Sequence, residues 1–297
     1  MTDQLTELTC KDCGDTFTLT KDERMLQAYL SFRSHFDTQL SRRCPKCKKK
    51  AIKAEQERET TLKAQEIATQ RLKWRTDSGI PAKFMAAEFG TWDKGRPGNV
   101  NYALQQCRKY ARGFPIDYHK YLEKRKAYPS LVLMSPGCKE FPDANGLGKT
   151  HLVAGIYHEI LNRWKGETSI CPVKFITEPG LFKEIQATYS YSNEDRNRLP
   201  SEVQIMRRLA YVPLLIIDDI AKETRKDMAF VQRTLFYIIN ERYNNQRPMV
   251  LTTNLDTAGL ASYLGGYTKD KAITDRLIEM CGKDYFIKMS GESYRRK

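Results

Sequence analysis

The chain has 297 residues, a formal net charge of +14 and a pI near 9.3. This length suits one full-sized domain with a smaller attachment, and the charge favours polyanionic partners, of which nucleic acid is the commonest. The sequence contains neither an apolar run long enough to span a bilayer nor a secretory signal, so we expect a soluble, cytoplasmic protein with no membrane partner.

Four of the eight cysteines form two Cys-x-x-Cys pairs near the N-terminus, Cys10 with Cys13 and Cys44 with Cys47. Each pair offers two thiolates from one tight turn, and a tetrahedral zinc ion needs two such pairs. Without a secretory signal, this usage favours reduced thiols or metal over disulfides. We therefore predict a small zinc-binding, partner-docking domain over residues 1–50. The alternative is four unbound thiols in a flexible arm.

A basic run and then a long helix follow the second cysteine pair. Seven lysines and arginines lie between Arg42 and Lys53, where they either contact phosphates or form a solvated face. The next segment, AEQERETTLKAQEIATQRLKWR, contains neither Gly nor Pro and is rich in strong helix formers. It predicts an exposed helical linker over residues 51–76.

From residue 77 to residue 297 the sequence predicts an α/β domain. A helix is expected to open at Asn99, a residue type that favours the N-cap position. Beyond it, apolar runs without polar alternation are typical of strands buried on both faces, and helical segments separate these runs. The pattern predicts a five-stranded, mostly parallel sheet with strands at Leu131–Met134, Val173–Thr177, Leu214–Ile217, Met249–Thr252 and Tyr285–Met289.

The loop after the first of these strands reads CKEFPDANGLGKT and runs into a helix. A glycine-rich loop at a helix N-terminus binds phosphate groups through free backbone N–H groups. Gly146 and Gly148 allow the backbone to approach the phosphates, Lys149 can reach the β and γ phosphates, and the Thr150 hydroxyl can bind Mg2+. The loop therefore predicts a nucleotide site.

The spacing of this loop departs from the usual pattern in one place. A glycine is expected five positions before Gly148, where the sequence has Asp143, and the nearest candidate is Gly137, six residues too early. We interpret Cys138–Asp143 as an insertion that bulges away from the phosphates and leaves the phosphate site intact.

Two further strands end in polar residues, at the edge of the sheet where ligands bind in parallel α/β folds. LLII is followed by Asp218, suited to hold Mg2+ through water, and by Asp219, suited to polarise an attacking water. Asn254 follows the next strand and can orient the same water. Acidic residues and asparagine also cap helices, and it is the order of the three motifs that favours the catalytic interpretation.

This order of motifs resembles the AAA+ ATPases, and among them the DnaC-type bacterial helicase loaders and the related IstB-like transposition ATPases. The resemblance extends from about Gly79 to Lys297 and is carried by GIPAKF, GKTHLVAGI, LLIIDDI, LFYIINERY, LTTNL, DRLIEM and GESYRRK. It implies an AAA+ P-loop core that binds ATP and Mg2+ and assembles into an ATP-bridged oligomer. Only twenty-one residues follow Arg276, which implies a reduced helical lid.

The resemblance also implies roles for individual residues. The Walker A, Walker B and sensor 1 positions are, in chain order, Lys149 and Thr150, Asp218 and Asp219, and Asn254. Arg276 in DRL matches the arginine finger, which reaches the ATP of a neighbouring subunit, and Arg295 in SYR matches sensor 2. The alternative for either arginine is an ordinary surface salt bridge.

By the same resemblance, the protein is an ATPase that loads a hexameric DnaB-type replicative helicase onto single-stranded DNA, with the zinc domain docking on the helicase. One alternative is an IstB-like helper that coats duplex DNA and directs a transposase. Another is a non-enzymatic adaptor whose nucleotide domain is inactive, which the irregular phosphate loop suggests.

Contacts to single-stranded DNA are expected at Lys183, Tyr189 and Tyr191, on and after the helix that follows the second strand. Aromatic side chains stack on bases, and nearby cations contact phosphates. The alternative is that these tyrosines are the frayed end of a helix whose apolar residues belong to the core.

Overall fold

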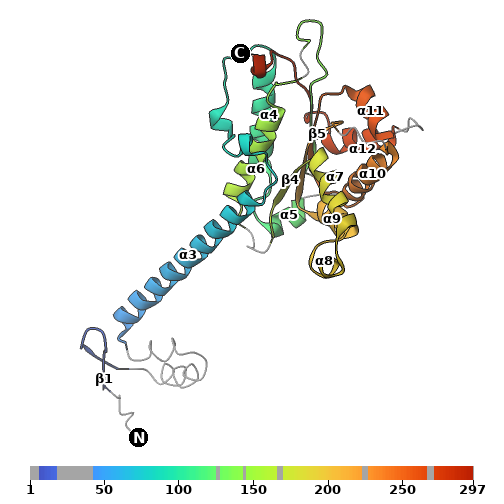
Figure 1. The fold of residues 1–297 in the computed structure, drawn as a ribbon. Coiled ribbons are helices and arrows are strands. Elements are labelled where there is room, and N and C mark those ends of the chain that lie inside the picture. Colours follow the sequence, from blue (N-terminus) through green and yellow to red (C-terminus); the bar gives the residue numbers. More distant parts are fainter. Residues whose placement is uncertain are drawn as a thin grey trace. The chain divides into compact units, whose positions relative to one another are not determined.

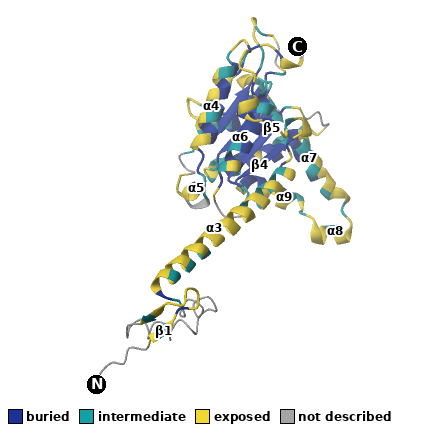
Figure 2. Ribbon diagram, turned by 90° about the vertical axis from the view of Figure 1, so that its left-hand side faces the viewer, coloured by how far each residue is buried: buried dark blue, intermediate teal, exposed yellow. Residues whose placement is uncertain are grey.

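The computed structural model describes residues 7–18, 43–124, 128–142, 145–165, 170–222, 227–265 and 271–296. The chain divides into two compact units, residues 1–69 and 70–297. Helix α3 (Pro45–Thr76) contains residues of both and buries none of its side chains, as its polar sequence predicts (Figures 1 and 2). Helix α3 begins at Pro45, inside the segment 1–50 that the sequence assigns to the zinc domain. The domain limits 1–50, 51–76 and 77–297 stay predictions.

The first unit contains a short antiparallel hairpin, β1 (Glu7–Thr9) and β2 (Thr16–Thr18), followed after residue 42 by the start of α3. The turn of the hairpin holds the first cysteine pair, and the Gly14 N–H donates to the carbonyl of Cys10 at 2.9 Å. Gly14 has a φ of 77°, a conformation that glycine adopts without strain. The second cysteine pair lies at the beginning of α3, so each pair is presented by one turn of backbone.

Five parallel strands form the sheet of the second unit, in the order β4-β5-β6-β3-β7. Continuous apolar runs favour strands covered on both faces, and the prediction of a five-stranded parallel α/β sheet is confirmed. The strands are β3 (Leu131–Met134), β4 (Val173–Thr177), β5 (Leu214–Ile220), β6 (Met249–Thr253) and β7 (Phe286–Lys288).

Helices cover both faces of this sheet (Figure 1). Side chains alternate along each strand: Leu131 and Leu133 enter one apolar core, Val132 and Met134 the other. The first core packs against α4 (Val100–Gly113) and α6 (Lys149–Arg163). The second packs against α7 (Glu178–Ala187), α9 (Glu202–Tyr211), α10 (Met228–Asn244), α11 (Thr257–Gly265) and α12 (Ala272–Cys281).

Short elements complete the described residues. They are η1 (Ala82–Phe84), η2 (Phe89–Thr91), α5 (Tyr118–Lys124), η4 (Thr188–Ser190), α8 (Asn193–Arg198) and η6 (Tyr294–Arg296). After α12 the described part of the chain contains β7 and η6. In the part of the chain that the structure describes, no helix combines the length and apolarity needed to cross a bilayer.

Asn99 stands immediately before α4, where the sequence places it, but its side chain does not cap that helix. It accepts the Ser290 N–H at 2.8 Å and donates to the Lys288 carbonyl at 2.7 Å. Asn99 thus fastens the C-terminal segment to the start of α4, a tertiary role that propensity alone does not reveal.

Candidate functional site

The carboxyl ends of β3, β6 and β5 lie next to one another because these strands are neighbours in a parallel sheet. Ser135 follows β3, Asp218 and Asp219 lie in the last part of β5, and Asn254 follows β6. Helix α6 begins at the same edge with Lys149. Strand order therefore gathers residues that are more than one hundred positions apart in the chain.

Lys149 is 6% exposed, and its ammonium contacts polar groups at the ends of two strands. Its Nζ donates to Oγ of Ser135 and to Oδ1 of Asn254, the second at 2.5 Å. Burial lowers the pKa of Lys149 to about 8, against the opposing effect of the carboxylates of Asp219 and Asp218. Ser135 and Asn254 are neutral acceptors, so a phosphate oxygen would be a stronger partner for this ammonium than either of them.

Asp218 and Thr150 form the second part of the site. Asp218 is 1% exposed and accepts from the hydroxyls of Thr150 at 2.8 Å and Thr252 at 2.6 Å. Burial, reinforced by the charge of Asp219, raises the pKa of Asp218 to about 6. A hydroxyl and a carboxylate side by side are the oxygen ligands that Mg2+ prefers, so these residues fit that ion.

Asp219 is presented by an irregular stretch of β5. The pairing with β6 shifts within residues 217–220, and Asp219 adopts a positive φ of 61°. Such a backbone costs a non-glycine residue about 1–3 kcal/mol and persists only where neighbours hold it. The Asp219 N–H donates to Oγ1 of Thr252 at 2.8 Å, and the fully buried Glu178 accepts the N–H of Lys222 at 2.9 Å. Thr252 and Glu178 therefore support the loop that carries Asp219, a role that the sequence did not signal.

The two glycines of the phosphate loop are required by close packing as well as by conformation. Gly146 and Gly148 have φ values of 78° and 93°. A Cβ at Gly146 would lie 2.2 Å from Oγ of Ser293, and one at Gly148 would lie 2.6 Å from the ring of Trp92. Any side chain at either position would push the loop away from its supports.

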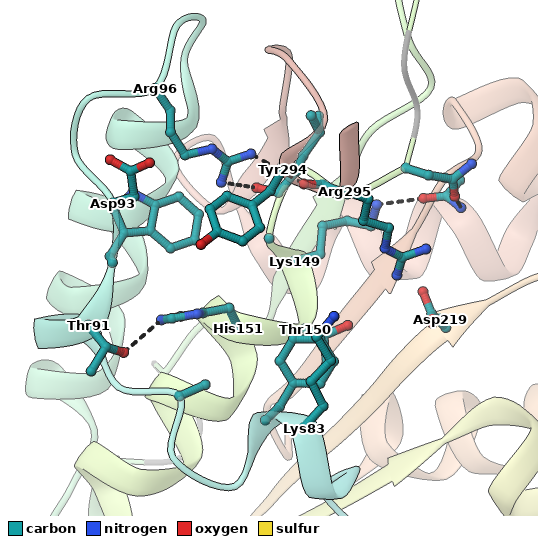
Figure 3. Close-up of a pocket in the computed structure, with 18 of the residues that line it drawn as sticks. Lys83, Thr91, Asp93, Arg96, Lys149, Thr150, His151, Asp219, Tyr294 and Arg295 are labelled. Carbon is teal, nitrogen blue, oxygen red and sulfur yellow. Dashed lines mark hydrogen bonds between the residues drawn. The ribbon is translucent and has the colours of Figure 1, made fainter. Parts of the chain in front are cut away.

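A cavity of about 370 Å³ opens over the phosphate loop (Figure 3), a volume within the usual range of about 300–1,000 Å³ for small-ligand sites. Its lining includes Lys149, Thr150, Asp219, Asn254 and the two loop glycines, so most of the residues predicted for the nucleotide site share one cavity. Of the described part of the insertion, residues 138–142, none lines this cavity, and Asp143 lies outside the described residues.

Another wall of the cavity comes from residues that the sequence analysis missed. They are Lys83, Thr91, Trp92, Asp93, Arg96 and His151. The segment FMAAEFGTWDKGRPGN marks the start of a folded unit by its aromatic and turn residues, but it lies about fifty positions before the phosphate loop. Only the tertiary fold brings it there.

The two arginines implied by the resemblance lie in different places. Arg295, in η6, lines the cavity with Lys149. Arg276, on α12, is half-buried outside the cavity lining, and its Nη1 donates to Oδ1 of Asn240 at 2.8 Å. Its guanidinium also lies 5.4 Å from the ring centre of Tyr243. Within its own chain Arg276 therefore belongs to a surface between α10 and α12.

The residues suggested for DNA contact lie apart from the cavity lining. Lys183 is exposed on α7, and Tyr189 in η4 is 59% exposed, with its hydroxyl donating to Oε2 of Glu202 at 3.0 Å. Tyr191, just after η4, is half-buried. The apolar residues of α7 are buried in the core, as the alternative interpretation expects. DNA contact by Lys183, Tyr189 and Tyr191 stays a prediction.

The four cysteines of the first unit converge. Their sulfur atoms all lie within 4.8 Å of one another, and those of Cys13 and Cys44 are 3.7 Å apart. A tetrahedral zinc ion with Zn–S bonds near 2.3 Å places its sulfur ligands roughly 3.8 Å apart. Hydrogen bonds shift the thiols of the cluster in opposite directions: backbone N–H groups, first that of Cys44, lower the pKa of Cys10 to about 6, while side-chain hydrogen bonds among the cysteines raise the pKa of Cys13 and Cys47. The donor set fits zinc.

A parallel α/β sheet with a phosphate loop, an acidic pair and an asparagine at its carboxyl edge defines a P-loop nucleotide-binding protein. The chain belongs to the IstB-like ATP binding protein family, whose model matches residues 142–297, more than half of the sequence.

Individual relatives are similar to the chain over a longer segment than the family model matches. The replicative helicase loader DnaC of Escherichia coli is 25% identical over 218 residues, which cover 73% of each chain. The phage-like element PBSX protein XkdC of Bacillus subtilis is 24% identical over 210 residues, 70% of this chain and 65% of that one. The resemblance to DnaC-type AAA+ proteins is therefore confirmed.

Solved structures similar to the chain include those of DnaC and DnaI. The crystal structure of the DnaC helicase loader gives a TM-score of 0.48 at 20% identity, covering 68% of this chain and 97% of that one. The crystal structure of DnaI gives 0.46 at 19% identity, with 71% and 92% covered.

Proposed function

We propose that the chain is an ATPase that loads a hexameric DnaB-type replicative helicase onto single-stranded DNA in the cytoplasm. The observation that carries this proposal is the similarity to a replicative helicase loader over 73% of both chains. The transposase-dependent alternative is not favoured, because the similarity to the loader extends well beyond the segment matched by the IstB-like model.

The polar groups at the sheet edge divide the work of ATP hydrolysis. Lys149 exchanges its contacts with Ser135 and Asn254 for the β and γ phosphates. Thr150 and Asp218 hold Mg2+, which neutralises charge on the phosphates during transfer. Asp219 polarises the attacking water, and the Asn254 amide, released from Lys149, orients it.

Two arginines complete the site, one from each side of a subunit contact. Arg295 already lines the cavity of its own chain and stabilises charge on the phosphates. Arg276 acts on the ATP of a neighbouring subunit, which is supported by its position outside its own cavity. Hydrolysis therefore requires an oligomer.

The zinc-bound first unit is the part that docks on the helicase. Four converging thiols can hold a metal ion that gives this unit a defined surface, since its described residues bury few other side chains. Single-stranded DNA lies against Lys183, Tyr189 and Tyr191, and weak contacts repeated across subunits add through multivalency.

The direct test combines hydrolysis with partner binding. ATP turnover is measured with the zinc-loaded protein alone, with single-stranded DNA and with a DnaB-type helicase, beside a Lys149→Ala variant. We expect turnover that Lys149→Ala abolishes, and co-purification of the helicase in a complex whose mass gives the subunit ratio.

Three results would contradict the proposal in different ways. Turnover no higher than that of Lys149→Ala would support a non-enzymatic adaptor. Hydrolysis without helicase binding would remove the loader role but keep the ATPase. Stimulation of a transposase in place of helicase binding would restore the IstB-like alternative.

A further inference from the structure

Arg96 lies in the cavity wall beside the phosphate loop and contacts three backbone carbonyls. It is 7% exposed. Its Nη1 donates to the carbonyl of Leu147 at 3.0 Å, and its Nη2 donates to those of Gly146 at 3.2 Å and Glu292 at 3.1 Å. One guanidinium therefore joins the phosphate loop to a segment 196 positions away from Arg96.

Aromatic rings fix the plane of this guanidinium. The carbon atom at its centre lies 5.2 Å from the ring centre of Trp92 and 5.6 Å from that of Tyr294 (Figure 3). Arginine presents its donors in a rigid planar fork that stacks on aromatic faces, which lysine cannot reproduce. The geometry is therefore specific to arginine and not to a positive charge alone.

The contacts of Arg96 also determine where the N–H groups of the loop point. In a trans peptide, the carbonyl of one residue and the N–H of the next point in opposite directions, and no peptide bond of the described chain is cis. Because Arg96 holds the carbonyls of Gly146 and Leu147 on one side, the N–H groups of Leu147 and Gly148 are directed to the other side of the loop. Loop N–H groups of this kind cradle phosphates.

The same arginine anchors the segment that carries Arg295. The Tyr294 N–H donates to the Gly146 carbonyl at 3.0 Å, beside the Arg96 contact. Backbones also meet directly, since a Cβ at Gly98 would lie 2.2 Å from the carbonyl oxygen of Ser290. A shift of Arg96 would therefore move both the loop and Arg295.

We propose that Arg96 is a positioning residue for the nucleotide: it orients the N–H groups of the phosphate loop and fixes Arg295 relative to them. The inference rests on the proposed ATP site and adds to it a residue that holds the loop backbone through its carbonyls. Removing Arg96 takes this donor from the Leu147 carbonyl and leaves the Gly146 carbonyl to the Tyr294 N–H. The loop and the segment that carries Arg295 then lose a shared contact, so affinity falls for every nucleotide that uses the loop.

Arg108 offers a matched control. Like Arg96 it donates to a backbone carbonyl, that of Phe89 at 2.8 Å, and its guanidinium lies 5.9 Å from an aromatic ring centre, also that of Phe89. It lies on α4 and is not part of the cavity lining. Arg108→Gln therefore removes the same kind of structural contact without touching the loop.

The experiment measures ATP and ADP affinity with a fluorescent nucleotide, together with KM, kcat and melting temperature. We expect Arg96→Gln to weaken both nucleotides by roughly 10- to 100-fold, the usual effect of losing a group that orients ligand-binding atoms. ADP is affected as much as ATP, since loop N–H groups contact the inner phosphates. Arg108→Gln should change affinity less than about threefold at a similar loss of melting temperature.

A double-mutant cycle tests the coupling to Arg295. If Arg96 positions that residue, the loss caused by Arg295→Ala should be at least about threefold smaller in the Arg96→Gln background, whereas independent sites give additive losses. A merely structural role of Arg96 would not produce this coupling. Arg96→Lys should give an intermediate affinity, because its ammonium can keep one carbonyl contact but not the fork.

Folded Arg96→Gln that binds ATP within threefold of the unmodified chain would overturn the inference while leaving the ATP site in place. Additive losses with Arg295→Ala would overturn the positioning of that arginine. If Arg96→Gln does not fold, Arg96→Lys replaces it, and affinity equal to that of the unmodified chain overturns the inference. An unmodified chain that binds no ATP would instead refute the proposed function.

Discussion

The two units of the chain are stabilised by different means. In residues 70–297, two apolar cores cover opposite faces of the sheet. Among the described residues of the first unit, the buried side chains are those of Cys10 and Cys44. The described part of this unit offers little apolar burial, and a metal ion bound by the converging thiols would add folding free energy. We therefore expect the first unit to depend on its metal, whereas the second is stabilised by packing.

Removing zinc should give the largest effect, and it should affect the two units differently. Structural zinc contributes about 10–16 kcal/mol in small zinc domains. Cys10→Ser, or a strong chelator, should therefore unfold the first unit and leave the second able to bind ATP. Zinc content, limited proteolysis and nucleotide affinity measured on the full chain check this.

Cys138→Ser is the matched control, because Cys138 is exposed and lies in the phosphate-loop insertion. It should keep both the zinc and the proteolytic resistance of the first unit. A purified chain without zinc whose first unit resists proteolysis would show that thiols alone suffice, and the comparison between the units would fail.

The second unit also buries polar side chains, and Arg242 is one of them. Arg242 is fully buried on α10 and donates to five backbone carbonyls, those of Leu209, Ala210, Val212, Pro213 and Pro248. Burial lowers the pKa of Arg242 to about 9, but the group stays protonated at neutral pH. These carbonyls belong to the last turn of α9 and to the residues just before β5 and β6, so Arg242 satisfies backbone groups that the core would otherwise leave unpaired.

Arg242→Met should lower the free energy of unfolding of the second unit by about 3 kcal/mol or more, because buried carbonyls lose their donors. Urea denaturation of the zinc-loaded chain, followed by a signal from the second unit, measures the change. Arg207→Met, at an exposed position of α9, is the control and should change stability by less than about 0.5 kcal/mol. A loss for Arg242→Met no larger than for Arg207→Met would refute the anchoring role.

The fold of the second unit was predictable because its signals are local. Continuous apolar runs locate all five strands to within a few residues, and the phosphate loop marks the start of α6. The end of β5 was predicted too early, at Ile217, because acidic residues there read as a strand end. The strand continues to Ile220 through the irregular stretch that holds Asp219.

The candidate site was predictable only in part, for a related reason. Lys149 and Asp218 belong to short motifs with a fixed spacing from strand or helix ends. Arg96 and Thr252 act through backbone atoms of distant segments, and no local pattern marks such contacts. Sequence motifs thus identify groups that touch the nucleotide better than groups that position the loop.

Asp219→Asn should slow ATP hydrolysis by the second unit without destabilising either unit. The substitution keeps the shape of the side chain but removes the carboxylate that we propose polarises water, so kcat should fall about 100-fold while ATP affinity changes less than about threefold. Steady-state hydrolysis and equilibrium binding separate the two quantities. Asp284→Asn, in an exposed turn, should leave both unchanged. Loss of affinity equal to the loss of kcat would assign Asp219 to binding instead.

Burial of the Asp218 carboxylate at the carboxyl edge of the sheet destabilises the folded second unit. Burial raises the pKa of this carboxyl from 3.8 to about 6, so folding disfavours its charged form. The sign follows from linkage: the cost is absent below about pH 4, where both states are protonated, and grows as pH rises to about 6, above which it is complete. From the size of the shift, the cost at neutral pH is about 2–3 kcal/mol.

Asp218→Asn should therefore stabilise the second unit at pH 7.5, measured without nucleotide or magnesium, by up to about 2 kcal/mol, because an amide can still pair with the hydroxyls of Thr150 and Thr252. The gain should shrink toward zero as the pH falls to about 4, and magnesium-dependent ATP binding should be lost at every pH. Denaturation series across this range give the curve. A variant less stable than the unmodified chain at pH 7.5 would contradict this prediction. It would mean that the hydrogen bonds from Thr150 and Thr252 stabilise the folded state by more than the burial of the Asp218 charge destabilises it.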